Sequence, residues 1–236
     1  VKRAIGAYFY LFRESLKKYI KYNKINSVNK IKRRLTMKKI IFATGNPTKA
    51  KRFSNGLAKH DIEVISLKDL DLKLDVDESG NNAIENALKK ARACFEKTKM
   101  PTIGMDDTLY LENVPADKQP GLFVRRVNGK TLNDEEMIEH YLNLVKEYGI
   151  DGKLNSKWIY GLAVINENGE ESTYTWHKDD FYMVDTKSSI INPGYPLNTV
   201  SKYKGIDKYF TEVSEEEKEK IRYNEDNVVE FIAKHI

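Results

Sequence analysis

One short segment of the sequence has the residue types of a phosphate-binding loop. Segment 44–49 reads Thr-Gly-Asn-Pro-Thr-Lys and lies between an apolar run and residues typical of a helix. The free N–H groups at the start of a helix attract anions, and glycine at Gly45 lets the backbone come close. Thr44, Asn46 and Lys49 add donors and a positive charge. The segment is not a Walker A pattern, and taken alone it could equally be a capped turn.

Carboxylates at two further places could hold a cation or activate water. Glu85 lies in the first turn of a predicted helix, and Asp106 and Asp107 follow a short predicted strand. Hard cations such as Mg²⁺ bind carboxylate oxygens together with substrate phosphates, and a carboxylate can deprotonate an attacking water. Each site alone could be a solvated acid or an acidic turn. Together with segment 44–49 they indicate metal-assisted phosphoryl chemistry.

Other kinds of chemistry find little support in the sequence. His60, His140, His177 and His235 show no metal-ligand spacing, and no Gly-x-Ser-x-Gly motif or Cys/His arrangement indicates covalent catalysis. The one cysteine, Cys94, cannot form an internal disulfide and falls at an apolar helical position, so we expect a small core residue.

Composition and charge limit the partners of this 236-residue chain. Hydrophobic residues make up 40% and charged residues 32%, so the chain can bury a core, and no run of 18 apolar residues predicts a membrane span. Residues 1–36 hold 11 of the 40 Lys and Arg but one of the 35 acids, which leaves 29 basic and 34 acidic residues in the body. We therefore expect neither nucleic acid nor membrane as a partner of the body.

The basic segment 1–36 reads as an extension outside the folded domain, which we place at residues 37–236. Two alternatives remain open for the segment. One is a basic amphipathic helix that contacts a membrane or nucleic acid. The other is a cleaved signal, although no small-x-small cleavage site follows the apolar run.

The pattern of the body predicts a mixed α/β fold. Strands are expected at 39–44, 62–67, 101–105, 158–165, 172–177 and 181–184, with Asn168-Gly169 as a hairpin turn. Helices are expected at 48–57, 82–97, 133–148, 214–220 and 227–234, the second of them capped by Asn81 or Asn82. Residues 68–80 and 115–121 read as loops, and 109–114 does not continue the strand before Asp106.

In the order of its motifs the chain resembles the inosine/xanthosine triphosphate pyrophosphatases, the Ham1-like family. The family's Thr-Gly-Asn-x-x-Lys motif matches Thr44 to Lys49, and its Glu-Asn-Ala helix matches Glu85 to Ala87 with Lys90 to Ala93. Three further motifs match in the same order, at Met105 to Thr108, at Pro120 to Gly129 and at Ser214 to Lys218. The matches cover the chain from about Met37 to its end.

The resemblance implies an elongated two-lobed, mixed-sheet α/β fold with the active-site cleft between the lobes. It implies hydrolysis of a nucleoside triphosphate to a monophosphate and pyrophosphate by a homodimeric, cytoplasmic enzyme. Asp107 would be the catalytic residue, activating water for attack at the α-phosphorus. Carried over by position, Glu85 and Asp107 would hold Mg²⁺, with Asp106 in support. The residues expected to bind substrate are Thr44, Gly45, Asn46, Lys49, Thr108, Arg126 and Lys218.

The chain departs from the family pattern where the family binds the base. Pro193-Gly194-Tyr195-Pro196-Leu197 stands for Phe-Gly-Tyr-Asp-Pro, and Arg222-Tyr223-Asn224 stands for Ser-His-Arg. We still expect Gly194, Tyr195, Tyr223 and Asn224 to contact the substrate, but with an altered base specificity. The alternative is a non-catalytic nucleotide-binding or sensing protein on the same fold.

Overall fold

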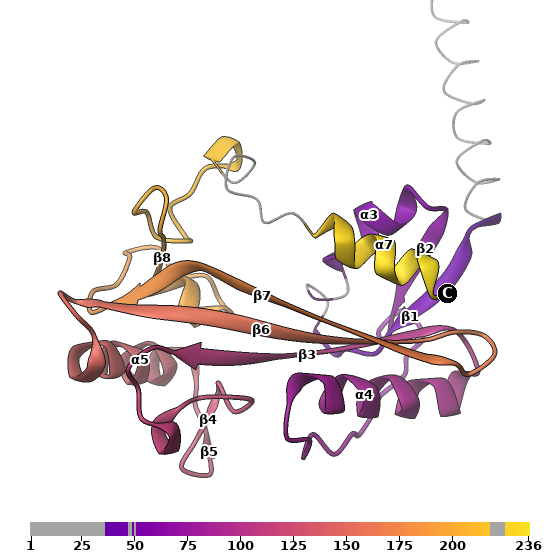
Figure 1. Ribbon diagram of the computed structural model, residues 1–236, viewed down its shortest axis with the longest axis horizontal. Helices are drawn as coiled ribbons and strands as arrows, with labels where there is room; N and C mark the ends of the chain where they lie inside the picture. The colour runs from indigo at the N-terminus through magenta and orange to yellow at the C-terminus, as the bar shows by residue number, and fades with distance from the viewer. Residues whose placement is uncertain (1–35, 47–48, 50, 218–224) are drawn as a thin grey trace, which may run out of the picture.

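Three long antiparallel strands run the length of the molecule and connect its two lobes (Figure 1). They are β3 (Thr102–Leu111), β6 (Lys153–Ile165) and β7 (Glu171–Val184). This computed structural model describes residues 36–46, 49, 51–217 and 225–236. The predicted class, an elongated two-lobed α/β fold with a mixed sheet, is confirmed.

The three long strands are the centre of a six-stranded sheet in the order β2-β1-β3-β6-β7-β8. Strands β1 (Lys38–Phe42) and β2 (Ile62–Ser66) are parallel to each other, and β1 is also parallel to β3. Strand β8 (Ser201–Tyr203) adds an antiparallel edge beside β7. Because β1 and β3 are parallel neighbours, the residues that follow β1 lie beside the middle of β3.

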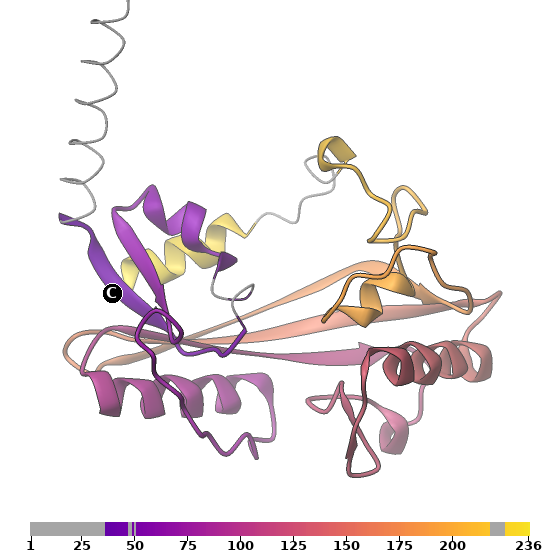
Figure 2. The same ribbon diagram turned by 180° about the vertical axis from the view of Figure 1, so that it is seen from behind.

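The first lobe has helices on both faces of the sheet, and the two opposite views agree on this (Figures 1 and 2). Helix α4 (Ala83–Thr98) covers one face, while α3 (Ser54–Ala58) and α7 (Asp226–Lys234) cover the other. Residues of the sheet and of α3 and α7 share one buried cluster, which includes Phe42, Leu57, Met105, Leu162 and Ile232.

A partly buried ion pair between Arg52 and Glu225 joins the chain before α3 to the start of α7. The Nε atom of Arg52 donates to both carboxylate oxygens of Glu225, at 3.1 and 3.0 Å. The guanidinium lies 4.4 Å from the ring centroid of Tyr160. Burial alone would lower the pKa of Arg52, but the contact with Glu225 outweighs it and the pKa is raised. The guanidinium of Arg52 therefore stays charged, and its bonds to Glu225 anchor the segment that follows the phosphate-binding loop.

Helix α4 packs directly on the sheet because two glycines leave room for its backbone. A Cβ atom on Gly104 would lie 1.9 Å from the carbonyl oxygen of Ala87, and one on Gly161 would lie 2.5 Å from the backbone of Ala83. No side chain could fit at these positions without moving the helix. This close approach brings α4 within side-chain reach of Asp106, two residues along β3 from Gly104.

The second lobe is built around α5 (Asp134–Tyr148), which packs on the other end of the long strands. Its core includes Leu109, Tyr141, Leu154, Phe181 and Met183. Short elements complete the lobe: η1 (Ala116–Lys118), β4 (Arg126–Val127), β5 (Lys130–Thr131) and η2 (Pro196–Thr199). Asn133 and Glu136 form a capping box at the start of α5.

Several predicted elements have different bounds in the structure. The strand expected at 101–105 continues as β3 to Leu111, so Asp106 and Asp107 lie within a strand and not in a turn after it. The strands expected at 172–177 and 181–184 are one strand, β7, and β6 begins at Lys153. The cause is the same for all: pairing with a neighbouring strand over many residues outweighs the weak local preference of polar residues.

The remaining helix and terminal predictions have mixed outcomes. Of the helix expected at 48–57, Lys49, Lys51 and Ser54–Ala58 are helical, with a turn at residues 52–53. Helices near 82–97, 133–148 and 227–234 are confirmed, with Asn82 as the cap of α4. Cys94 is fully buried, as predicted. Residues 1–35 lie outside the described residues, so the extension stays a prediction. No helix within the described ranges is long and apolar enough to cross a membrane.

Candidate active site

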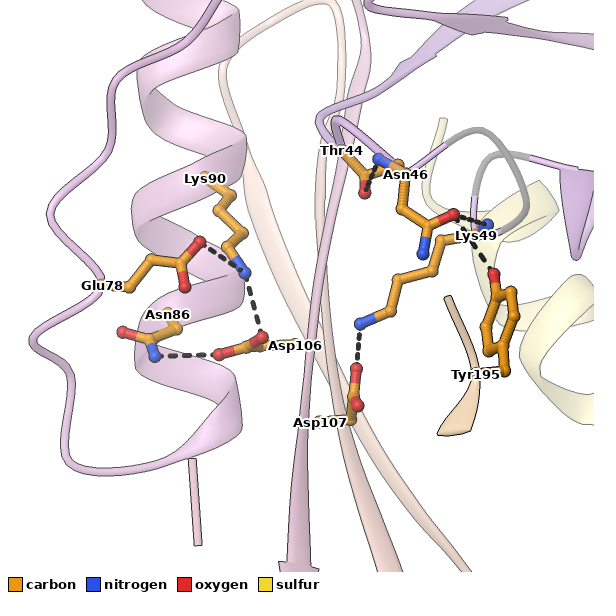
Figure 3. Close-up of polar contacts among 9 residues, drawn as sticks. All are labelled: Thr44, Asn46, Lys49, Glu78, Asn86, Lys90, Asp106, Asp107 and Tyr195. Carbon is orange, nitrogen blue, oxygen red and sulfur yellow. Dashed lines mark hydrogen bonds and ion pairs between the residues drawn. The ribbon is translucent and has the colours of Figure 1, made fainter. Parts of the chain in front are cut away.

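The loop after β1 presents Asn46 and Lys49 beside the middle of β3 (Figure 3). The backbone N–H of Asn46 donates to Oγ1 of Thr44 at 3.1 Å, and the N–H of Lys49 donates to Oδ1 of Asn46 at 3.4 Å. These local bonds hold the turn in place. The ammonium of Lys49 supplies a full positive charge here.

Asp107 and Lys49 form an ion pair between β3 and this loop. Both side chains are about a quarter exposed, at 21% for Asp107 and 29% for Lys49. An ion pair that is open to solvent on one side can be exchanged for another partner at modest cost. Lys49 can therefore meet either Asp107 or an incoming anion.

Asp106 lies beside α4, and two side chains of that helix donate hydrogen bonds to its carboxylate (Figure 3). Nδ2 of Asn86 donates to Asp106 at 2.8 Å, and Nζ of Lys90 donates to it at 2.9 Å. Lys90 also reaches the carboxylate of Glu78 at 3.1 Å. Burial alone would lower the pKa of Lys90, but these two carboxylates outweigh it and raise the pKa, so the ammonium stays charged.

Asn86 also holds the acidic loop before α4 next to the site. Its side chain is 1% exposed, and its Oδ1 accepts the backbone N–H of Gly80 at 2.8 Å. The same amide thus bonds Gly80 on one side and Asp106 on the other. This arrangement keeps Glu78, two residues before Gly80, close to Lys90 and Asp106.

One cavity of about 380 Å³ connects these groups with the second lobe. On the first lobe it is lined by Asn46, Lys49, Glu78, Asp106 and Asp107. On the second lobe it is lined by residues 122–126, Met137 and 194–198, and Trp158 of β6 lies between the two sides. A cavity with carboxylates and a lysine at one end and aromatic and apolar groups at the other suits a ligand that has both a phosphate chain and a ring.

Two arginines belong to the second-lobe wall. Arg125 donates to Asp134 at 2.8 Å. The guanidinium of Arg126 lies 4.7 Å from the ring centroid of Phe123, which is 48% exposed. Arg126 has no carboxylate partner within the described ranges, so its charge is available to an anion in the cavity.

The structure brings together some of the predicted site residues and leaves others outside the cavity. Asn46, Lys49, Asp106, Asp107, Arg126, Gly194 and Tyr195 all line it. Of the described residues predicted for the site, Thr44, Gly45, Thr108 and Glu85 do not. The predicted residues Lys218, Tyr223 and Asn224 lie outside the described residues.

Glu85, which was expected to hold Mg²⁺, is bonded to the residues that cap α4. Its carboxylate accepts the backbone N–H of Asn81 at 2.8 Å and Nδ2 of Asn82 at 2.9 Å. In return, its own N–H donates to Oδ1 of Asn82 at 2.9 Å. These reciprocal bonds are those of a helix cap. Glu85 therefore helps to start α4, and Glu78 is the glutamate that lines the cavity.

Sequence reasoning missed Glu78, Asn86 and Lys90 as parts of the site. Asn86 and Lys90 are one helical turn apart, so helical spacing alone places them on one face. Glu78 belongs to a thirteen-residue acidic loop, residues 68–80, which has no periodic pattern. The local sequence therefore does not indicate which of its acids faces the cavity. Its place follows from the bond between Asn86 and Gly80.

The acids of the cavity are held by lysines in the structure. No group of three or more His, Cys, Asp or Glu side chains is arranged to hold a metal ion in the part of the chain that the structure describes. Three carboxylates nevertheless line one cavity, at Glu78, Asp106 and Asp107. Mg²⁺ commonly takes only one or two protein carboxylates and completes its shell with water and phosphate oxygens. This donor set therefore fits such a cation together with a phosphate ligand.

Comparison with known proteins identifies the family of this chain. The model of the Ham1 family matches residues 40–231. The dITP/XTP pyrophosphatase of Caldanaerobacter subterraneus subsp. tengcongensis is 31% identical over 188 residues, which cover 79% of this chain and 90% of that protein. The dITP/XTP pyrophosphatase of Thermoanaerobacter pseudethanolicus is 29% identical over 193 residues, with 82% and 94% covered.

A solved structure shares the fold. The Ham1 protein of Staphylococcus aureus has a TM-score of 0.65 at 22% identity, covering 84% of this chain and all of that one. A two-lobed α/β protein with a polar cavity between its lobes is the class that fold and site define. The chain belongs to the Ham1 family. The resemblance read from the sequence is thereby confirmed, and the predicted activity is the one for which its curated relatives are named.

Proposed function

We propose that this protein hydrolyses a nucleoside triphosphate to the nucleoside monophosphate and pyrophosphate. The observation that carries the proposal is a single cavity lined by Lys49, Asp106 and Asp107 at one end and by aromatic and apolar side chains with two arginines at the other. The names of the relatives, dITP/XTP pyrophosphatases, support the same reaction. The triphosphate lies at the first end, and the base lies toward the second lobe.

Lys49 supplies the positive charge that a triphosphate needs when it enters. In the structure its ammonium pairs with Asp107. A triphosphate carries more negative charge than one carboxylate, so the ammonium turns to the phosphate oxygens. The exchange leaves an oxygen of Asp107 free at the moment when substrate is present. Asn46 and Arg126 line the same cavity and add donors to the phosphate chain.

Asp107 then acts as the general base. It accepts a proton from a water molecule whose oxygen forms a bond to the α-phosphorus. The bond between the α-phosphorus and the bridging oxygen breaks, and pyrophosphate leaves with the electron pair. Asp106 is held in place by Asn86 and Lys90, so it does not compete with Asp107 for the position of the base.

We propose Mg²⁺ as the cofactor, held by Glu78 and Asp107 with support from Asp106. This assignment replaces Glu85 by Glu78, because Glu78 lines the cavity and the carboxylate of Glu85 caps α4. When bound there, Mg²⁺ would supply positive charge that offsets the charge of the phosphates.

We propose further that base preference differs from that of the family pattern. Gly194, Tyr195 and Pro196 line the cavity wall where that pattern has an acidic acceptor after the tyrosine. Proline offers no side-chain acceptor. A missing hydrogen bond to a base costs roughly 1–3 kcal/mol, which is about a 5- to 140-fold change in preference.

The direct test is pyrophosphate release from a panel of purine and pyrimidine triphosphates, including ITP, XTP and dITP, with Mg²⁺. We expect turnover of at least one of them and its loss in Asp107→Asn. Tight nucleotide binding without product from the wild type would instead support the non-catalytic alternative. The set of Lys49, Asp106 and Asp107 favours the enzyme, because a sensor has no need of a base beside the phosphates.

We also propose a homodimer acting in the cytoplasm, as the family resemblance implies. Light scattering of the full chain would measure the mass in solution. A mass close to twice 27.3 kDa supports the dimer, and a mass close to that of one chain opposes it.

A further inference from the structure

A turn of the second lobe, residues 193–198, forms one wall of the cavity and is held from outside it. Gly194 has φ of +80°, which favours glycine. Its backbone N–H donates to Oδ2 of Asp134 at 2.8 Å. Asp134 is the first residue of α5, 60 positions earlier in the chain. The turn is thus anchored to a helix of the same lobe.

The carboxylate of Asp134 is itself fixed on its other side. Nη1 of Arg125 donates to Oδ1 of Asp134 at 2.8 Å and to the carbonyl oxygen of Leu132 at 3.2 Å. The N–H of Gly194, and after it Arg125, holds the pKa of Asp134 below its ordinary value. Two oxygens with two different donors leave this carboxylate little freedom to turn.

The turn reaches from the second lobe to the phosphate-binding loop of the first. Oη of Tyr195 donates to Oδ1 of Asn46 at 3.3 Å, and the same oxygen accepts the N–H of Lys49 at 3.4 Å (Figure 3). Asp134, Gly194, Tyr195 and Asn46 therefore form a continuous series of contacts across the cavity. We call this series the brace.

We propose that Asp134 is a positioning residue that sets the width of the cavity between the phosphate-binding loop and the base-side turn. It acts through Gly194 and Tyr195 and touches no reacting atom. The inference rests on the proposed function. A nucleoside triphosphate must contact both walls at once, so its binding depends on their spacing. A ligand that occupies only the phosphate end does not depend on it.

The variant Asp134→Ala should leave the start of α5 intact, because Asn133 and Glu136 keep the capping box. We expect it to raise KM for the nucleoside triphosphate about tenfold, as for the loss of a hydrogen bond to a charged group, with kcat changed less than about threefold. The inhibition constant of inorganic triphosphate should stay within about twofold. Asp134→Asn keeps one acceptor for Gly194, so its KM should be close to that of the wild type.

A second measurement does not depend on turnover. Hydrogen exchange of the peptide that contains Gly194 and Tyr195 should be faster in Asp134→Ala than in the wild type. Tyr195→Phe removes the other end of the brace, so it should give the same pattern of KM and inhibition constant. Glu135→Ala is the matched control. It removes the next acid of the same helical turn, which lines a different groove, beside residues 187–191.

The outcomes separate the inference from the proposed function. A wild type that hydrolyses nucleotides, with Asp134→Ala unchanged in KM and in exchange, overturns the brace alone. Equal weakening of the nucleotide and of inorganic triphosphate also overturns it, because it would mean a general loss of structure. A wild type without any nucleotide turnover overturns the proposed function, and the role of Asp134 falls with it.

Discussion

The two ends of the cavity are built in different ways. At the phosphate end, Asp106, Asp107 and Lys90 lie on the regular elements β3 and α4. The two charged groups from loops are each paired with one of them: Lys49 with Asp107, and Glu78 with Lys90, which also pairs with Asp106. At the base end, the wall consists of turns, a proline and an exposed Phe123 stacked with Arg126. Regular elements fix position and turns tolerate change. We therefore expect substitutions to abolish catalysis at the first end and to alter substrate choice at the second.

The largest effect should come from Asp107. Asp107→Asn keeps the shape of the side chain but removes the base, so kcat should fall roughly 10²- to 10⁴-fold while KM changes little. Steady-state kinetics with the best substrate of the panel measures this. Asp106→Asn is the matched comparison, since Asp106 is held by Lys90 and Asn86, and its effect on kcat should be smaller. Equal losses from the two variants would contradict separate roles.

A second comparison separates the two glutamates near the start of α4. Glu78→Gln should lower kcat/KM by about tenfold or more and raise the Mg²⁺ concentration needed for half-maximal rate. Glu85→Gln, in contrast, should leave that concentration unchanged and lower the free energy of unfolding by up to about 1 kcal/mol, because it weakens the cap. A Mg²⁺ requirement that shifts with Glu85 and not with Glu78 would restore the assignment made from sequence.

A substitution at the base end should change selection without stopping the reaction. Pro196→Asp adds an acceptor to the cavity wall, so bases with a ring N–H should gain about tenfold in kcat/KM over bases without one. The maximal rate with the best substrate should stay within about threefold. The measurement is the ratio of kcat/KM for ITP and ATP. A large fall in kcat for every nucleotide would mean that this wall also takes part in catalysis.

The smallest effect concerns acid stability in the second lobe. Burial lowers the pKa of His140 below its ordinary value near 6.5. Below that value the unfolded chain binds the proton more readily, so the contribution of neutral His140 is complete above pH 6.5 and is lost as the pH falls through the lowered pKa. His140→Gln should therefore flatten the dependence of Tm on pH between about 7 and 5. Parallel curves for the variant and the wild type would show that His140 does not titrate there.

Features that depend on neighbouring residues could be predicted from the sequence, and features that depend on distant contacts could not. The helix capped by Asn82 could be read from the sequence because it depends on neighbouring residues, whereas the roles of segment 44–49 and Asp107 stay predictions. The strand position of Asp106 and Asp107 could not, since it arises from pairing with β6, some fifty residues later. The position of Glu78 depends on the bond that the N–H of Gly80 donates to the side chain of Asn86. The proposed role of Asp134 depends on its contact with Gly194, 60 positions later in the chain. Such contacts leave no periodic signal.

The most direct test of the account asks which phosphorus the water attacks. The reaction is run in water enriched in ¹⁸O, and the two products are analysed by mass spectrometry. With Asp107 directing water to the α-phosphorus, the label should appear in the nucleoside monophosphate and not in pyrophosphate, and Asp107→Asn should form little of either product. Label in pyrophosphate, or release of inorganic phosphate and a diphosphate, would contradict the account.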